Sequence, residues 1–82
     1  MTVQAVVPLE SMRCDERGRL MAIDGVESSV HRLQEMGLRE GARVRMIRPG
    51  SPCIVQVNDQ RLSLRTGGEV LILVQLDAGV AE

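Results

Sequence analysis

The chain has 82 residues, enough for one compact domain and too few for a second. Its hydrophobic and charged fractions, 44% and 26%, are ordinary for a globular protein, and no apolar run approaches the roughly 20 residues that span a bilayer. Arginines and carboxylates nearly balance at a net charge of -1, and there is no Phe, Tyr or Trp, which argues against a dedicated nucleic-acid binder.

We expect a single domain over residues 1–82, with its core over about 7–76 and a frayed tail over 77–82. No basic segment followed by an apolar one opens the chain, so a secretory signal is not expected. The sequence therefore predicts a cytoplasmic protein.

The first half of the chain predicts two strands. An apolar opening segment ends at Pro8, which places that strand at a sheet edge because proline cannot donate a ladder hydrogen bond. Residues 17–18 then introduce a second strand over residues 19–23, which Asp24 and Gly25 close.

A helix is predicted over about residues 26–36. Apolar residues recur there at helical spacing: Val26, Val30, Leu33 and Met36. Asp24 and Glu27 have the spacing of a capping box, and Ser28 is an alternative N-cap one turn later. Gly37 stands where a left-handed residue ends a helix.

The second half returns to a period of two. Val44 and Met46 should face inward from a strand over residues 43–48. Further strands are expected over residues 53–57, 61–65 and 70–76, separated by turns, and the last is nearly continuously apolar, as in burial on both faces or barrel closure. Five to six short strands with one inserted helix predict a mainly β fold, a small SH3-like barrel.

Enzyme chemistry finds little support in the sequence. His31 lies beside two serines of the predicted helix, but no nucleophile-elbow or glycine-rich motif surrounds it, and Glu27 is its expected neighbour. The Gly67-Gly68 pair precedes a strand, whereas a phosphate-binding loop opens a helix. We therefore expect a protein that is not an enzyme.

The soft or borderline metal ligands of this chain are Cys14, His31 and Cys53. No CxxC, HxxxH or ExxH spacing joins them, so a closed structural zinc site is not predicted. The cysteines are expected to be two partly buried free thiols. No cofactor is required, and a weak contact with Fe²⁺ or another divalent metal stays open.

Arginine placement is the remaining chemical feature. Arg43, Arg45 and Arg48 fall on or near one face of a predicted strand, and Arg61 and Arg65 flank another. One interpretation is a solvated barrel exterior. The other is a docking surface, because arginine is enriched at interfaces and binds carboxylates through two parallel hydrogen bonds.

Residues 32–44, RLQEMGLREGARV, resemble the signature of the FeoA family, in which a helix ends at a glycine and a second glycine precedes a strand. The resemblance extends from Val7 to Leu76, and its most specific part runs from Leu33 to Gly41. It implies a small SH3-like domain that accompanies the ferrous-iron transporter FeoB, a membrane protein with a cytosolic GTPase domain. Similar domains form the C-terminal part of certain metal-dependent repressors. The sequence shows no helix-turn-helix before the barrel, so we expect the stand-alone accessory form.

The resemblance thus implies a non-enzymatic accessory protein of ferrous-iron uptake that docks to FeoB and modulates its activity or assembly. Nucleic acid and direct membrane insertion are not expected, and self-association stays open. The candidate contacts lie on the exposed helix side and on the arginine-bearing strand: Arg32, Glu35, Arg39, Arg43 and Arg45. Two alternatives remain, a protein that binds or senses Fe²⁺ directly and an SH3-like adaptor for another partner.

Overall fold

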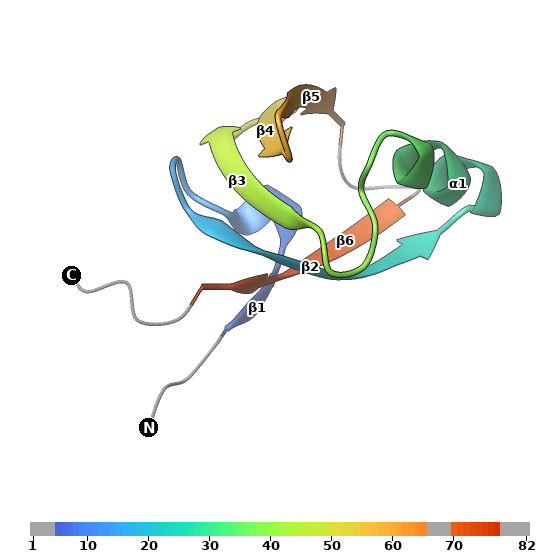
Figure 1. Ribbon diagram of the computed structural model, residues 1–82, viewed down its shortest axis with the longest axis horizontal. Coiled ribbons are helices and arrows are strands. Elements are labelled where there is room, and N and C mark those ends of the chain that lie inside the picture. Colours follow the sequence, from blue (N-terminus) through green and yellow to red (C-terminus); the bar gives the residue numbers. More distant parts are fainter. Residues whose placement is uncertain (1–4, 66–69, 78–82) are drawn as a thin grey trace.

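The computed structural model describes residues 5–65 and 70–77, which form one six-stranded antiparallel sheet and one α-helix (Figure 1). The elements in chain order are β1 (Val6–Pro8), a 3-10 helix η1 (Leu9–Ser11), β2 (Arg17–Gly25), α1 (Glu27–Glu35), β3 (Arg43–Arg48), β4 (Cys53–Val57), β5 (Gln60–Leu64) and β6 (Val70–Leu76). The strands are ordered β1-β6-β2-β3-β4-β5 across the sheet. The predicted mainly β fold with one inserted helix is confirmed, and the turn at 66–69 and the tail at 78–82 lie outside the described residues.

The sheet curls into a small barrel around one apolar core, with β4 and β5 lying across from β2 and β6 (Figure 1). Buried side chains from five strands, η1 and two loops form this core: Leu9, Met12, Leu20, Leu38, Val44, Met46, Cys53, Val55, Val57, Leu64, Ile72 and Val74. Full burial of each large aliphatic side chain contributes about 1.5–3 kcal/mol. Aliphatic and sulfur-containing residues therefore build the core of a chain that has no Phe, Tyr or Trp.

The inward positions of β3 are as predicted, because Val44 and Met46 are both buried. Strand β6 differs from its apolar pattern. Ile72 and Val74 are buried, but Leu71 is 46% exposed, so only one face of this strand lies against the core. Leu71 pairs with Asp24 near the end of β2, where nothing in the described residues covers the outer face enough to bury it.

Helix α1 begins without the predicted capping box. Val26 is its N-cap in an extended conformation, and no side-chain hydrogen bond caps the first turn. Asp24 and Gly25 instead belong to β2, which pairs with β6 up to Gly25, so neither Asp24 nor Ser28 occupies the cap position. Within the described residues, no helix has the length and apolar character needed to cross a bilayer.

The C-terminal end of α1 is as predicted. Gly37 has a φ of +104°, the Gly37 N–H donates to the Gln34 carbonyl at 3.0 Å, and the Leu38 N–H donates to the Leu33 carbonyl at 3.0 Å. These two bonds make a Schellman motif, in which an apolar contact joins the residue after the glycine to the last turn. Leu38 is fully buried, so the motif fixes the helix end to the barrel.

Strand β2 starts earlier than predicted. Arg17 and Gly18 are its first two residues rather than a turn that precedes it. Gly18 is paired with Val44 of β3 on one side and with Leu76 of β6 on the other. Asp77, which we placed in the tail, donates its backbone N–H to the Arg17 carbonyl at 2.9 Å.

Candidate functional site

Two neighbouring strands present arginines on the outer surface of the barrel. In β2, exposed Arg17 and Arg19 flank buried Gly18. In β3, Arg43 and Arg45 flank buried Val44. Successive side chains of a strand point to opposite faces of the sheet, so all four arginines lie on the outer face. We call this set the arginine face: Arg17, Arg19, Arg43 and Arg45.

The strand register places these arginines directly opposite one another. Arg17 is paired with Arg45, and Arg19 is paired with Arg43. Neighbouring strands are about 4.8 Å apart, and alternate residues of one strand are about 7 Å apart, so the four Cα atoms form a compact rectangle. Like charges at directly opposite positions reduce stability by up to about 1 kcal/mol. The two like-charged cross-strand pairs, taken by themselves, therefore oppose folding slightly.

Two carboxylates compensate part of this charge. Asp15 accepts a hydrogen bond from Arg45 Nη2 at 2.8 Å, and Asp77 accepts one from Arg43 Nη2 at 3.2 Å. Both pairs are open to solvent, where such ion pairs contribute about 0–1 kcal/mol. Within residues 5–65 and 70–77, the side chains of Arg17 and Arg19 have no hydrogen-bond or ion-pair partner.

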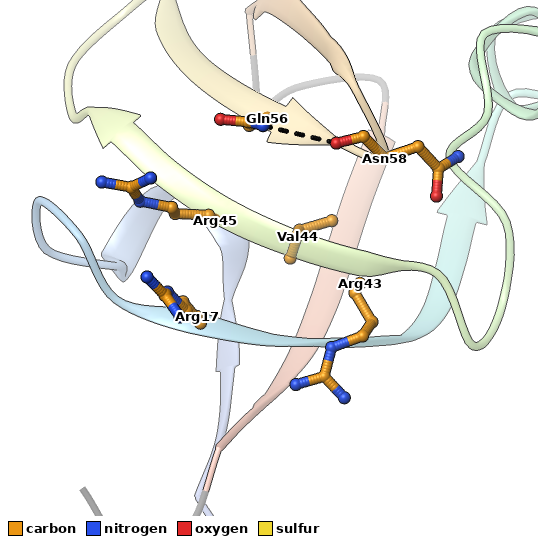
Figure 2. Close-up of a pocket in the computed structure, with 6 residues that line it drawn as sticks. All are labelled: Arg17, Arg43, Val44, Arg45, Gln56 and Asn58. Carbon is orange, nitrogen blue, oxygen red and sulfur yellow. Dashed lines mark hydrogen bonds between the residues drawn. The ribbon is translucent and has the colours of Figure 1, made fainter.

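A shallow hollow of about 430 Å³ lies beside these side chains. Figure 2 shows its lining, with Arg17 and Arg45 projecting from adjacent strands to the same side: Arg17, Arg43, Val44, Arg45, Gln56 and Asn58. The Gln56 amide donates to the Asn58 carbonyl at 3.4 Å. Arg45 Nε is shielded from solvent yet has no hydrogen-bond partner. The hollow thus combines cationic groups and an amide.

The helix-side candidates are placed elsewhere. Arg32 and Glu35 are exposed on α1. This helix follows the C-terminal end of β2, whereas Arg17 is at the N-terminal end of the same strand (Figure 1). His31 Nε2 lies 3.1 Å from a Glu35 carboxylate oxygen, one helical turn away. Arg39 Nε donates to the Gln34 carbonyl at 3.1 Å, so this side chain adds a second hydrogen bond to a carbonyl at the helix end that already accepts the Gly37 N–H. The structure therefore separates the two sets of predicted contacts into two surfaces.

The metal-ligand candidates do not come together. Cys14 is exposed in the turn before β2, where its thiol donates to the Ile47 carbonyl at 3.2 Å. His31 is on α1, and Cys53 is fully buried at the start of β4. Among the described residues, no group of three or more His, Cys, Asp or Glu side chains is placed to hold a metal ion.

Both cysteines are free thiols in different environments. We expected two partly buried thiols, but Cys14 is exposed and Cys53 is in the core. Desolvation by burial raises the pKa of the Cys53 thiol above its ordinary value, and this outweighs the opposing effect of a backbone hydrogen bond. Cys53 therefore remains protonated and acts as a small apolar side chain.

Sequence reasoning missed half of the arginine face. Arg17 was placed before the second strand, and Arg19 was not grouped with Arg43 and Arg45. The signal was present, because Arg17 and Arg19 alternate with Gly18 as Arg43 and Arg45 alternate with Val44. Only the pairing of β2 with β3 brings the two alternating pairs together.

Comparison with known proteins identifies the family to which the chain belongs. Its sequence matches the FeoA domain over residues 7–76, and no curated protein matches it. Among solved structures, it is similar to one described as "Iron Uptake Regulatory Protein (FeoA)", with 28% identity, a TM-score of 0.78, and coverage of 88% of this chain and 99% of the other. The barrel is therefore SH3-like, as expected. The chain belongs to the FeoA family.

Proposed function

We propose that this protein is a non-enzymatic, cytoplasmic accessory protein of ferrous-iron uptake that docks to a FeoB-type transporter and modulates its activity or assembly. Membership of the FeoA family supports the role in iron transport. The solved structure similar to this chain is described as an iron uptake regulatory protein, which supports the same role. The observation that carries the docking mechanism is the arginine face.

The physical argument for docking rests on charge. Arginine presents five donors in a rigid fork, so it binds a carboxylate through two parallel hydrogen bonds and loses little side-chain freedom when it does. Four such groups lie on a sheet surface, and in the described part of the chain two carboxylates, Asp15 and Asp77, pair with two of them. Electrostatic complementarity therefore favours a partner that brings further negative charge to this surface.

The experiment is an amide-resolved NMR titration of the protein with the soluble GTPase domain of its own FeoB, repeated with the detergent-solubilised transporter. We expect saturable shifts over residues 43–48 and 17–19. The double variant R43Q/R45Q should weaken binding at least tenfold, whereas R32Q/E35Q on α1 should leave it unchanged. Flat spectra with both FeoB preparations would overturn the proposal.

A Fe²⁺ titration under anaerobic conditions tests direct metal binding in the same samples. Cys14, His31 and Cys53 lie on three separate elements, so we expect no tight stoichiometric uptake by the monomer. Tight uptake that is lost in Cys14→Ser or His31→Ala would replace docking by metal sensing as the leading function.

A further inference from the structure

The arginine face stands out because the chain as a whole is slightly acidic. The net charge is -1, yet four guanidinium groups occupy one rectangle of the sheet, and within residues 5–65 and 70–77 Asp15 and Asp77 are the carboxylates that pair with them. Arg17 and Arg19 have no partner among the described residues. The surface is therefore locally cationic.

The register makes this arrangement costly to keep. Arg17 opposite Arg45 and Arg19 opposite Arg43 are like-charged cross-strand pairs, which destabilise a sheet relative to neutral pairs. Neutral polar residues would fit the same exposed positions without repulsion. Places where a sequence departs from the most stable local choice are commonly functional sites.

The spacing of the face indicates the shape of its ligand. Alternate side chains along β2 and β3 repeat at about 7 Å, and an extended polypeptide presents its own alternate side chains at the same repeat. We propose that the arginine face binds an extended acidic segment of the partner protein, with Asp or Glu at alternate positions facing the arginines. This inference rests on the proposed docking function and names the chemistry that docking recognises.

Polar side chains continue from the arginine face across the sheet, in the direction perpendicular to the strands. Arg45 is paired with Gln56 of β4, and Gln56 is paired with Arg61 of β5. The row Arg17, Arg45, Gln56 and Arg61 thus crosses four strands, with the hollow beside it. The Gln56 amide uses one N–H on the Asn58 carbonyl, and its second N–H can donate to carboxylate or backbone oxygens of the bound segment.

A protein segment is favoured over nucleic acid by composition. Single-stranded nucleic acid binders stack bases on aromatic side chains, and this chain has no Phe, Tyr or Trp. The chain also lacks the overall basic excess that is typical of nucleic-acid binders, because its net charge is -1.

The test uses fluorescein-labelled ten-residue peptides and the intact protein. One peptide alternates Glu with Ser, a second has the same composition with all Glu in one block, and a third replaces Glu by Gln. Fluorescence anisotropy is measured at 25 and 300 mM NaCl. We expect the alternating peptide to bind at least threefold tighter than the block peptide, the neutral peptide not to bind, and affinity to fall with salt because exposed charges are screened.

Variants locate the site. R17Q/R19Q should weaken binding of the alternating peptide at least tenfold, while R32Q/R65Q, which removes the same charge from two exposed arginines elsewhere, should change it less than twofold. R17Q/R19Q should also raise the melting temperature, because it removes like-charged pairs; a merely structural role predicts a lower one. Equal loss of affinity in both variants, or equal affinity for the alternating and neutral peptides, would overturn the inference.

Two further outcomes separate the inference from the function on which it rests. If R17Q/R19Q binds FeoB as the wild type does, docking stands and this recognition site is wrong. If the wild type binds the alternating peptide but not FeoB, the recognition site stands and the proposed function is wrong. Tighter binding of a ten-nucleotide single strand than of the peptide at 300 mM NaCl would replace the acidic segment by nucleic acid.

Discussion

Gly18 of β2 lies so close to Gln75 of β6 that a Cβ atom on Gly18 would stand 2.5 Å from the Gln75 carbonyl oxygen. The same atom would stand 2.6 Å from a methyl group of Val74. The close approach lets β2 and β6 pair while β2 also pairs with β3. Arg17 and Arg19, on either side of the glycine, are paired with Arg45 and Arg43 of β3 in the same part of the sheet.

Gly18→Ala should destabilise the protein by about 1–3 kcal/mol, because the added methyl group meets a backbone atom that cannot move without disturbing the ladder. Urea unfolding followed by circular dichroism measures this change. Arg17→Gln, one residue away and exposed, is the matched control and should not lower stability. Equal midpoints for Gly18→Ala and wild type would show that the sheet relaxes freely here.

Gly37→Ala should destabilise the protein by about 1–2 kcal/mol. The cost comes from the backbone, because φ at Gly37 is +104° whereas a Cβ atom there would make only ordinary contacts of 3.8 and 3.9 Å. Gly37→Asn is the control, since asparagine tolerates positive φ better than alanine, and it should recover part of the loss. Thermal melts of the three proteins compare them, and equal losses for Ala and Asn would contradict the backbone explanation.

Leu38→Ala should cost about 2–5 kcal/mol, because this side chain is fully buried and its removal leaves a cavity beneath the end of α1. Leu71→Ala removes the same atoms from a side chain that is 46% exposed, so it should cost much less. Chemical unfolding of both variants gives the difference. Similar losses at the two positions would mean that Leu38 does not hold the helix end to the barrel.

Alkaline pH should destabilise the protein through Cys53. Burial raises the pKa of this thiol in the folded chain, so above about pH 8.5 the unfolded chain loses the proton first and binds fewer protons than the folded one. Stability is therefore complete below that pH and falls as the pH rises through the raised value. The chain has no Lys or Tyr, so few other groups titrate in this range.

Urea midpoints between pH 7 and 10.5 measure this dependence. Cys53→Ala should be less stable throughout but should lose less with rising pH, whereas Cys14→Ser at the exposed cysteine should retain the wild-type slope. The expectation fails if Cys53→Ala and wild type show the same slope.

Much of the fold was predictable because its signals are local. Alternation of apolar residues identified β3 and its inward Val44 and Met46, and Gly37 marked the end of α1, because both depend on neighbours within a few residues. The position of α1 was predicted correctly but its capping residue was not, since pairing of β2 with β6 keeps Asp24 in the sheet and leaves Val26 as the cap. Asp24 could cap the helix or extend the strand, and its pairing with Leu71, more than forty residues away along the chain, decides for the strand.

Local sequence patterns were enough to predict a mainly β barrel, its single helix, its family resemblance and the outward position of Arg43 and Arg45 beside the inward Val44 and Met46. Tertiary structure alone decided that Arg17 and Arg19 stand opposite them, that Cys14 and Cys53 have opposite environments, and that the metal-ligand candidates lie apart. The physical reason is that alternation along a strand fixes which face a side chain occupies, whereas its neighbours on that face depend on which strands pair and in which register.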